Sequence, residues 1–293
     1  MIQQFNKIEI SGWRYYNHAA VPTCAPHEMP DLSPVRDGRV WSLGGGTSVL
    51  FVRYTTCFDC KKETPFWYVI KDGPFVFEDL GKKQKKHVQK AMERCEVRII
   101  NPKEYTEQIW EVTSAAYRGY ENADNEKSKE EYLSDIVNAG YEIWGAFAKD
   151  TKKLTGWMAC ENKGEYTMTV LAKYHPEMQK DYRPSDALHC TVLTHYLNIL
   201  NQRYICSGTR NINHKTNSQA YKIEHWGFRK AYCDLNIIYR QWFGFVIRLL
   251  YQLRWFLLLF DKVTVFHQVN SLLLMEEISR ECKRTRKHNM NCN

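Results

Sequence analysis

The sequence lacks the signals that mark several large classes of protein. It contains no P-loop and no RNA-recognition motif, so neither nucleotide hydrolysis nor a standard RNA-binding module is indicated, and we expect no DNA partner. The first residues, MIQQFNKIEISGW, have no basic segment followed by an apolar one. A secretory signal requires both, so we expect the chain to be cytoplasmic.

The ten cysteines form neither a disulfide framework nor a recognisable set of metal ligands. In the cytoplasm they are expected to be mostly reduced thiols. The only close pair is Cys57 and Cys60, in CFDC, and a zinc knuckle needs two further ligands at matching spacing, which do not follow. We therefore interpret the pair as part of a turn and expect no metal cofactor.

Positive charge is in excess and is unevenly placed. The formal net charge is +8, which favours an anionic partner but does not choose among CoA, phospholipid, lipid-linked sugar and RNA. Basic residues gather in GKKQKKHVQK, residues 81–90, and in CKRTRKH, residues 282–288. The first block has helical spacing of apolar residues, so we expect a helix with a basic face.

The expected elements indicate a mixed α/β (α+β) protein. Residues 1–47 are rich in turn formers and aromatics with little periodic order, while 48–57 and 65–72 have the pattern of a β-hairpin. From residue 95 the expected order is strand, two helices, three antiparallel strands, helix, strand, helix, strand. We divide the chain into an N-terminal extension with hairpin and basic helix (1–94), a central domain (95–240), an amphipathic helical segment (241–280) and a basic disordered tail (281–293).

This order resembles the fold of the GNAT acyltransferases, in which two strands splay apart and the acyl-CoA arm enters the gap. The most specific local match is NSQAYKIEHWGFRKA, residues 217–231, which is similar to the family's N-x-x-A helix followed by Gly-Phe. The lysine-rich helix and the Pro-Ser entry at Ser185 resemble the FemAB-like and polysaccharide-locus branches. The resemblance implies a mixed, largely antiparallel central sheet flanked by helices.

The same resemblance implies acetyl-CoA or another acyl-CoA as donor. GNAT proteins hold its pyrophosphate on backbone amides of a glycine-rich helix start, where this chain has KDYRPSDALH without glycine. The helix start still offers amides and a positive dipole end, although an acidic residue in the first turn would compete with an anion. The candidate donor-binding residues are Arg183, Ser185, Asp186, Ala187 and Arg210, the last as a bidentate partner for phosphate or carboxylate.

Candidate catalytic residues lie on the helix expected from about 213 to 226. His214, Asn217 and Tyr221 follow i, i+3, i+7 spacing and share one stripe. A histidine of near-neutral pKa can deprotonate an amine or hydroxyl, so His214 is the first candidate base. A solvated polar face explains the stripe equally well. The residues expected to pack on the sheet lie opposite: Ile212, Ala220, Ile223 and Trp226.

The N-terminal extension has an unusual density of polar aromatics. Irregular segments that lie against a scaffold often supply contacts to an acceptor substrate. Tyr16, His18 and His27 are therefore secondary candidates for substrate binding, and the alternative is that the aromatics only anchor the extension.

Residues 241–262 are strongly apolar, but Arg248 and Arg254 interrupt them, so no uncharged run reaches the ~20 residues of a spanning helix. An interfacial amphipathic helix at the inner face of the membrane fits better, and the basic tail would strengthen binding to an anionic membrane surface. Packing on the sheet or on a second subunit is the alternative. The residues of the expected apolar face are Val246, Leu249, Leu250, Leu253, Phe256, Leu257 and Phe260.

These observations lead to an expected function and two alternatives. We expect transfer of an acyl group from acyl-CoA to an amine or hydroxyl of a sugar or lipid-linked glycan intermediate. The first alternative is FemAB-like aminoacyl transfer from charged tRNA, supported by the basic helix. The second is a catalytically degenerate GNAT-fold binding module, motivated by the missing glycine-rich loop and by Ile223, which stands where many GNAT proteins have a tyrosine.

Overall fold

The computed structural model describes residues 9–44, 48–118, 128–212 and 217–290, the side chains of 287–290 excepted. The chain folds into two compact units, and each unit draws on more than one segment. Of the described residues, unit 1 contains 69–208 and 217–229, and unit 2 contains 9–68, 209–212 and 230–290.

Unit 1 contains six neighbouring strands of a sheet, of which β5 begins, and β10 ends, in unit 2. Its strands follow the spatial order β5-β10-β9-β8-β7-β6. They are β5 (Phe66–Asp72), β6 (Cys95–Ile100), β7 (Glu142–Ala148), β8 (Leu154–Asn162), β9 (Tyr166–Tyr174) and β10 (Tyr204–Thr209). From β6 to β9 each strand pairs antiparallel with the next, whereas β10 pairs parallel to β9. The three consecutive antiparallel strands predicted between residues 141 and 173 are confirmed.

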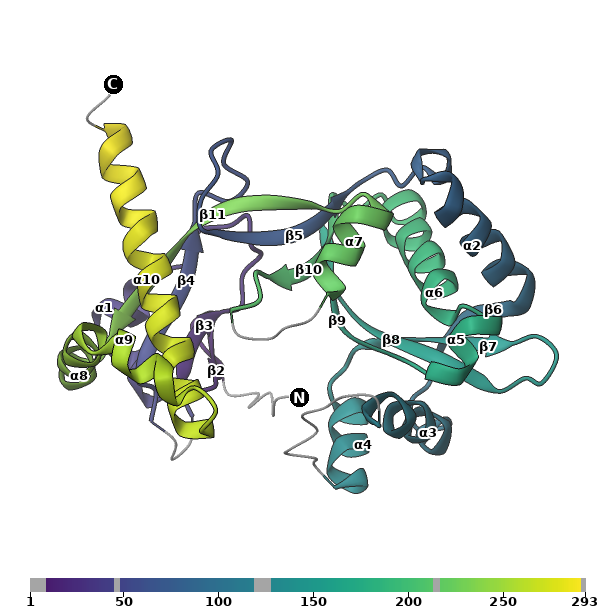
Figure 1. Cartoon of the computed structure of the whole chain (residues 1–293), viewed down its shortest axis with the longest axis horizontal. Coiled ribbons are helices and arrows are strands. Elements are labelled where there is room, and N and C mark those ends of the chain that lie inside the picture. The colour runs from purple at the N-terminus through teal and green to yellow at the C-terminus, as the bar shows by residue number, and fades with distance from the viewer. Residues whose placement is uncertain (1–8, 45–47, 119–127, 213–216, 291–293) are drawn as a thin grey trace. The chain divides into compact units, whose positions relative to one another are not determined.

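Helices cover both faces of this sheet, with α3 and α4 on one face and α6 on the other (Figure 1). They are η2 (Phe77–Asp79), α2 (Lys82–Arg94), α3 (Thr106–Tyr117), α4 (Lys129–Asn138), α5 (Pro176–Asp181), α6 (Pro184–Leu193), its continuation η3 (Thr194–Ile199) and α7 (Ser218–Trp226). Helix α4 begins at a capping box formed by Ser128 and Glu131. The predicted fold class, a mixed, largely antiparallel sheet flanked by helices, is confirmed.

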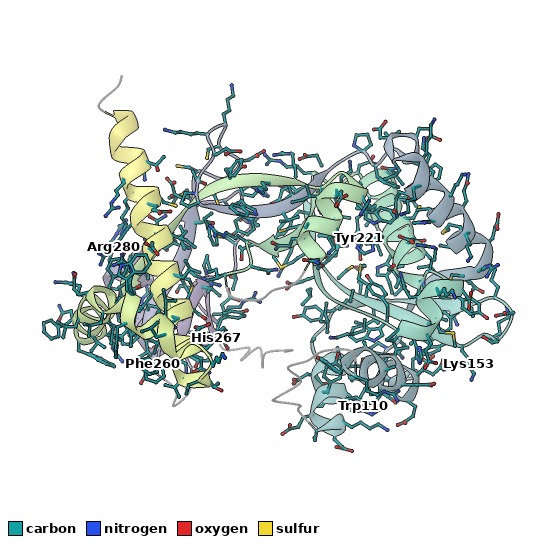
Figure 2. The ribbon with its side chains drawn as sticks, in the orientation of Figure 1. Trp110, Lys153, Tyr221, Phe260, His267 and Arg280 are labelled. Carbon is teal, nitrogen blue, oxygen red and sulfur yellow. The ribbon has the colours of Figure 1, made fainter. Side chains whose placement is uncertain are left out.

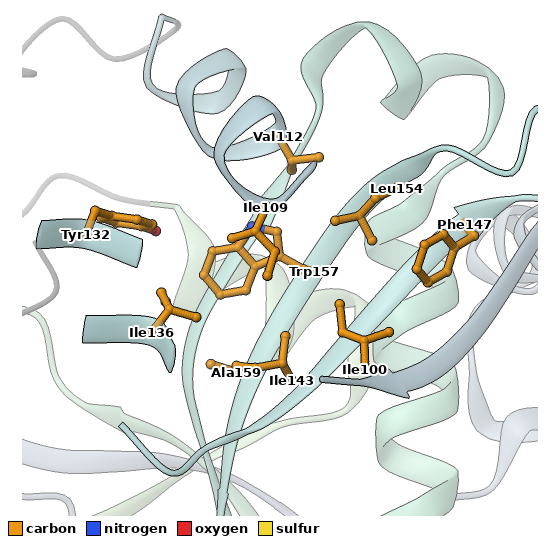
Figure 3. Close-up of a cluster of buried hydrophobic side chains, with 10 residues drawn as sticks. All are labelled: Ile100, Ile109, Val112, Tyr132, Ile136, Ile143, Phe147, Leu154, Trp157 and Ala159. Atoms are coloured by element: carbon orange, nitrogen blue, oxygen red, sulfur yellow. The ribbon is translucent and has the colours of Figure 1, made fainter. Parts of the chain in front are cut away.

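The core between the sheet and α3 and α4 follows from the alternation of side chains along β8. Trp157 and Ala159 point towards these helices and pack against Ile109 of α3 and Ile136 of α4 (Figure 3). All four are buried. Because successive side chains of a strand point to opposite faces, Met158 between them is buried on the α6 side.

Unit 2 is built on a second set of strands, in the order β1-β2-β3-β4-β11. They are β1 (Glu9–Ile10), β2 (Trp13–Tyr16), β3 (Ala19–Pro22), β4 (Phe51–Thr56) and β11 (Arg229–Tyr239). The short helices α1 (Ser33–Arg36) and η1 (Arg39–Ser42) follow β3. Trp13, Val40 and Val52 are fully buried and join these elements in one apolar cluster.

Two expectations for the first part of the chain are wrong. Residues 9–22, expected to be irregular, contain the hairpin of β2 and β3, whose two-residue turn is Asn17-His18 with φ of 46° and 59°. Positive φ at both turn positions is the geometry that suits the twist of a hairpin. The predicted hairpin of 48–57 with 65–72 does not form, because β4 pairs antiparallel with β11.

The last part of unit 2 is helical. It contains α8 (Gln241–Gln252), α9 (Arg254–Leu257), η4 (Leu258–Phe260) and α10 (Thr264–Met290). The chain bends by 75° between α8 and the segment Arg254–Phe260, so the expected continuous helix over 241–262 is wrong. Helix α10 runs through the first ten residues of the expected disordered tail.

Candidate functional site

The parallel pairing of strands β9 and β10 is short. Their parallel register runs from Tyr166 opposite Tyr204 to Met168 opposite Cys206, although both strands continue further. The register of β9 with β8 shifts at Val170, between pairs made by its two neighbours, which is a β-bulge. A bulge bends its strand and re-aims the side chains that follow. No β9–β10 pair is described beyond Met168, and this is the place at which the GNAT resemblance leads us to expect a gap between two strands.

The ammonium group of Lys222, on α7, lies just beyond the last of these pairs. Its Nζ donates a hydrogen bond of 2.5 Å to Ser207 Oγ of β10 and lies 3.5 Å from Thr169 Oγ1 of β9. The Lys222 side chain is buried, whereas Ser207 and Thr169 are half-buried and reach solvent. The two strands are thus joined, past their last backbone pair, by one amine and two hydroxyl groups.

This ammonium group has no acidic partner among the described residues. Its hydrogen bonds go to hydroxyls, and the charged form is penalised because burial lowers the pKa of Lys222 to about 8. Burial also raises the pKa of the nearby Cys160 and Cys206 thiols to about 12, so neither supplies a thiolate at neutral pH. A buried cation without a counter-ion is stabilised by any ligand that brings negative charge to it.

His189 of α6 is buried beside this group and is held neutral. Its Nδ1 is 2.7 Å from the carbonyl oxygen of Ser185, to which it donates, and its ring stacks on Trp226 at 5.1 Å. Burial, followed by the charge of Lys222, lowers the pKa of His189 to about 4. Its Nε2 is buried without a hydrogen-bond partner. The ring packs α6 against α7, as expected for a core histidine.

The carboxylate of Asp186 is the centre of a second cluster, at the start of α6. Asp186 is fully buried, and its oxygens accept hydrogen bonds from Arg183 Nη1 at 2.9 Å, Gln84 Nε2 at 2.8 Å and Tyr221 OH at 3.0 Å. These partners come from α2, α7 and the residue before α6. Helix α6 therefore carries its own anion at the positive end of its dipole.

The backbone amides at this helix start are already used. Pro184 has no N–H, and the N–H of Ser185 donates to Gln179 Oε1 at 3.4 Å. The N–H groups of Asp186 and Ala187 both donate to the carbonyl oxygen of Arg183, at 3.0 and 3.2 Å. The structure thus brings four of the predicted donor-binding residues together. Their polar groups are engaged within the protein, so the described N–H groups at this helix start are not free to bind a pyrophosphate.

The predicted catalytic stripe on α7 is only partly described. Tyr221, labelled in Figure 2, is half-buried on α7 and donates a hydrogen bond to Asp186. Burial together with that carboxylate raises the pKa of Tyr221 to about 12. Asn217 is the exposed N-cap residue of α7, and its side chain makes no capping hydrogen bond. His214 lies outside the described residues. The expected apolar face needs correction, because Ala220 is exposed and Lys222 is buried in its place beside Trp226.

The remaining predicted residues lie in unit 2. Arg210 Nη1 donates to the carbonyl oxygen of Pro65 at 2.5 Å, and its guanidinium stacks 4.9 Å from the ring centre of Trp67. These contacts occupy the group predicted to bind phosphate. They do so with a backbone carbonyl and an aromatic face, so Arg210 ties its own segment to Pro65 and Trp67 within unit 2.

The three candidates of the extension also have structural contacts. His18 lies in the β2–β3 turn, with Nδ1 3.3 Å from Tyr15 OH and from the carbonyl oxygen of Ser48. Tyr16 lies under the guanidinium of Arg53, and the ring of His27 packs against that of Phe58. No two of Tyr16, His18 and His27 share a described contact.

A basic surface adjoins the Asp186 cluster. Helix α2 packs on α6 and donates Gln84 to Asp186, which leaves Lys82, Lys83 and Lys86 exposed on its outer side. His87 is half-buried there, and its pKa is lowered by burial and by Arg183. Exposed lysines beside a guanidinium form a surface suited to a ligand that carries several phosphates.

Two comparisons give no match, since neither a family model nor a curated protein matches the chain. Among solved structures, FemX aligns with a TM-score of 0.49 at 10% identity, over 67% of this chain and 67% of that chain. A tandem GNAT protein from the clavulanic acid biosynthesis pathway aligns with a TM-score of 0.43 at 11% identity, over 75% of each chain. L-PGS from Bacillus licheniformis aligns with a TM-score of 0.40 at 10% identity, over 66% of this chain and 62% of that chain. These likenesses are of fold at low identity, so the function of this chain has to rest on its own residues.

Proposed function

We propose that the protein is an acyl-group transferase in which the carbonyl group of the donor binds beyond the last pair of β9 and β10, beside Lys222. The observation that carries the proposal is a buried ammonium group, bonded to Ser207 at 2.5 Å, with no acidic partner among the described residues. Such a group stabilises the negative charge that develops on a carbonyl oxygen during acyl transfer.

In the proposed reaction, Lys222 and Ser207 act only as hydrogen-bond donors to the carbonyl oxygen. An amine or hydroxyl of the acceptor attacks the carbonyl carbon, and a new C–N or C–O bond forms. The carbonyl oxygen becomes negatively charged, and the ammonium group of Lys222 and the hydroxyl of Ser207 are the nearby donors. The bond to the carrier then breaks, and the proton of the acceptor passes to the leaving atom. Because the pKa of Lys222 is about 8, most of the enzyme carries the positive charge at neutral pH.

For the donor we propose a charged tRNA. The start of α6 supports this choice, because Asp186 fills the place at which a pyrophosphate would bind and the amides there are occupied. The adjoining basic surface of α2 supports it as well, because exposed lysines bind the phosphates of a nucleic acid backbone without reading its sequence.

Acyl-CoA, the donor expected from the resemblance, is the second candidate. The short β9–β10 pairing favours it, since Thr169 and Ser207 are half-buried residues beyond the last strand pair, where the GNAT fold receives the acyl-CoA arm. On this alternative the phosphates would bind to the lysines of α2 rather than to the start of α6. For the acceptor we keep the predicted class, a sugar or lipid-linked glycan intermediate.

Thermal-shift titrations with a charged tRNA and with acetyl-CoA test the proposal. A ligand at about 100 times its dissociation constant stabilises the folded state by about 2.7 kcal/mol, which is a readable rise in Tm. We expect a rise with charged tRNA that shrinks steeply with salt. A salt-tolerant rise with acetyl-CoA alone would move the assignment to acyl-CoA. No rise with either ligand would contradict both and favour the non-catalytic binding module.

Matched variants test separately the binding of tRNA by the lysines of α2 and the transfer step at Lys222. We expect Lys83→Gln/Lys86→Gln to weaken tRNA binding, whereas Lys152→Gln/Lys153→Gln, which removes the same charge from the turn after β7, should leave it unchanged. Lys222→Met should retain binding and lose transfer from the carrier. Equal effects of the two double variants would argue against the α2 surface, and full transfer by Lys222→Met would argue against the site.

A further inference from the structure

A large apolar surface covers one region of unit 2. Its members are large hydrophobic residues between Trp242 of α8 and Val265 at the beginning of α10 that are at least 40% exposed. We call this set the apolar surface: Trp242, Phe245, Leu249, Leu253, Trp255, Phe256, Leu258, Leu259, Phe260, Val263 and Val265. Trp255 is 69% exposed and Leu259 is 76% exposed. Soluble monomers rarely expose contiguous apolar patches of more than a few hundred Å², and larger ones mark sites of interaction.

The apolar surface is distinct from the face by which these helices pack on the protein. The same helices already bury a separate set of residues, Ile247, Tyr251 and Leu257, against Leu273 of α10. Figure 1 shows α8 and α9 lying beside α10, which they contact. The segment thus has an inner apolar face that holds it to the protein and an outer one without a described partner.

The bend of the segment from α8 to η4 suits helices that lie along a membrane surface rather than a helix that crosses the membrane. Among the described residues no single helix is long and apolar enough to cross a membrane, and only the bent pair α8 and Arg254–Phe260 passes on length and composition. Its bend of 75° lies at Leu253, which is itself exposed. Helices that lie in a membrane interface bury one face of aromatic and aliphatic side chains by about 5–10 Å.

Basic residues outnumber acidic ones around the apolar surface. The one acidic residue of 241–263, Asp261, accepts a hydrogen bond from Asn270 at 2.8 Å and lies 3.2 Å from His267. No aspartate or glutamate occurs between Asp234 and Asp261 in the sequence, while Arg248 of α8 and Lys262, after η4, are exposed. Arg254 is less available to an external anion, because its guanidinium stacks on Trp255 and its Nε lies 3.8 Å from Glu277 Oε1. A second copy of the chain would place like charges against one another across a symmetric interface, which disfavours self-association. Anionic lipid headgroups complement them.

From these observations we infer that the apolar surface docks on the surface of an anionic lipid bilayer, with Trp255 and Leu259 inserted and Arg248 and Lys262 among the headgroups. The inference goes beyond the proposed function and does not depend on it. A protein held in this way meets lipid-linked acceptors in two dimensions rather than by diffusion through solution.

Co-sedimentation of the full chain with vesicles tests the inference. We expect binding to vesicles of phosphatidylcholine mixed with phosphatidylglycerol, and much weaker binding to phosphatidylcholine alone. Trp255→Ser/Leu259→Ser should reduce binding to the mixed vesicles at least tenfold. Arg248→Gln/Lys262→Gln should reduce it by about fivefold per charge removed and leave the residual binding to phosphatidylcholine unchanged.

The matched control is Met29→Ser/Ile199→Ser, which removes two apolar side chains of similar exposure, 66% and 64%, outside the apolar surface. Its vesicle binding should equal that of the unaltered chain. Equal loss in the control, or no binding to either kind of vesicle, would overturn the inference. So would a dimer in solution that Trp255→Ser/Leu259→Ser dissociates, because the apolar surface would then bind a second copy.

Discussion

Lys222 and Ser207 join a helix to a strand through a hydrogen bond of 2.5 Å between an ammonium group and a hydroxyl. Lys222 is buried on α7, and Ser207 follows the last residue of β10 that pairs with β9. A lysine in this position has a cost for folding, since its charge is removed from water without an acidic partner. Natural proteins retain such strain mostly where function requires it.

The first prediction concerns stability. Lys222→Met should stabilise the folded protein at pH 7, because the folded state lowers the pKa of this group from 10.5 to about 8 and so opposes its charge. The effect should be about 3 kcal/mol at most. Urea unfolding of the variant against the unaltered chain measures it. Lys83→Met, on the exposed side of α2, is the control and should have little effect.

The lowered pKa of Lys222 also makes the stability of the folded protein depend on pH. The folded state releases its proton near pH 8 and the unfolded state near 10.5, so the unfolded state binds more protons between these values. Lys222 should therefore contribute a rise in stability with pH across this window. The buried Cys160 and Cys206 thiols act in the opposite direction above about pH 9, because burial raises their pKa to about 12. In Lys222→Met this contribution should be lost, so the slope of stability against pH should be less positive than in the unaltered chain, while the contribution of Lys173, whose pKa burial also lowers to about 8, remains. Identical slopes in the two proteins would contradict the assignment.

The second prediction concerns activity. If the ammonium form of Lys222 stabilises the developing charge, the rate of acyl transfer should fall as pH rises through about 8, where that group loses its proton. Single-turnover transfer at saturating donor measures this step without a contribution from binding. Lys222→Met should be slow at every pH and should lack the step. A step that persists in the variant would assign the titration to another group.

The sequence predicts most of unit 1 because its signals are local. Three strands joined by short turns appear as β7, β8 and β9, and the helix predicted from Ser185 appears as α6 with its continuation η3. The pairing of β4 with β11 could not be predicted in this way. Its partners, such as Tyr54 and Asn236, are far apart along the chain, and neighbouring strands offered an equally good local match.

The candidate site was harder to predict than the fold. Lys222 occupies a buried position of an amphipathic helix, where an apolar residue is the ordinary choice, and lysine is counted as exposed by default. The sequence offered one indication that Lys222 is buried. It stands four residues before Trp226, so it lies on the same face of the helix as that apolar residue. The bend at Leu253 has no signal of its own, because neither proline nor glycine occurs there.

The third prediction concerns the cluster at the start of α6. Asp186→Asn keeps the shape of the side chain but removes the charge that Arg183 and the helix dipole stabilise, so it should destabilise the protein by about 1–3 kcal/mol. Tyr221→Phe removes one of the hydrogen bonds and should cost about 1 kcal/mol. Thermal unfolding of the single and double variants measures their coupling. Fully additive effects would show that the 3.0 Å contact contributes nothing.

Asp186→Asn also tests why the start of α6 has no free anion site. Without the internal carboxylate, Arg183 and the positive end of the helix can accept an external anion. Inorganic phosphate should then raise the Tm of the variant and leave that of the unaltered chain unchanged. A response of equal size in both proteins would mean that phosphate binds elsewhere, for example at the lysines of α2.

The fourth prediction concerns the core on the α3 side of the sheet. Trp157 Nε1 donates to Thr113 Oγ1 at 3.2 Å, and the hydroxyl of Thr113 donates in turn to the carbonyl oxygen of Ile109 at 2.7 Å. Thr113→Val preserves the volume but leaves the indole N–H buried without an acceptor, so it should destabilise the protein by about 1–3 kcal/mol. Thr113→Ser keeps the hydroxyl and should be milder. If Thr113→Val leaves the free energy of unfolding in urea unchanged, the hydrogen bond to Trp157 does not hold α3 against β8.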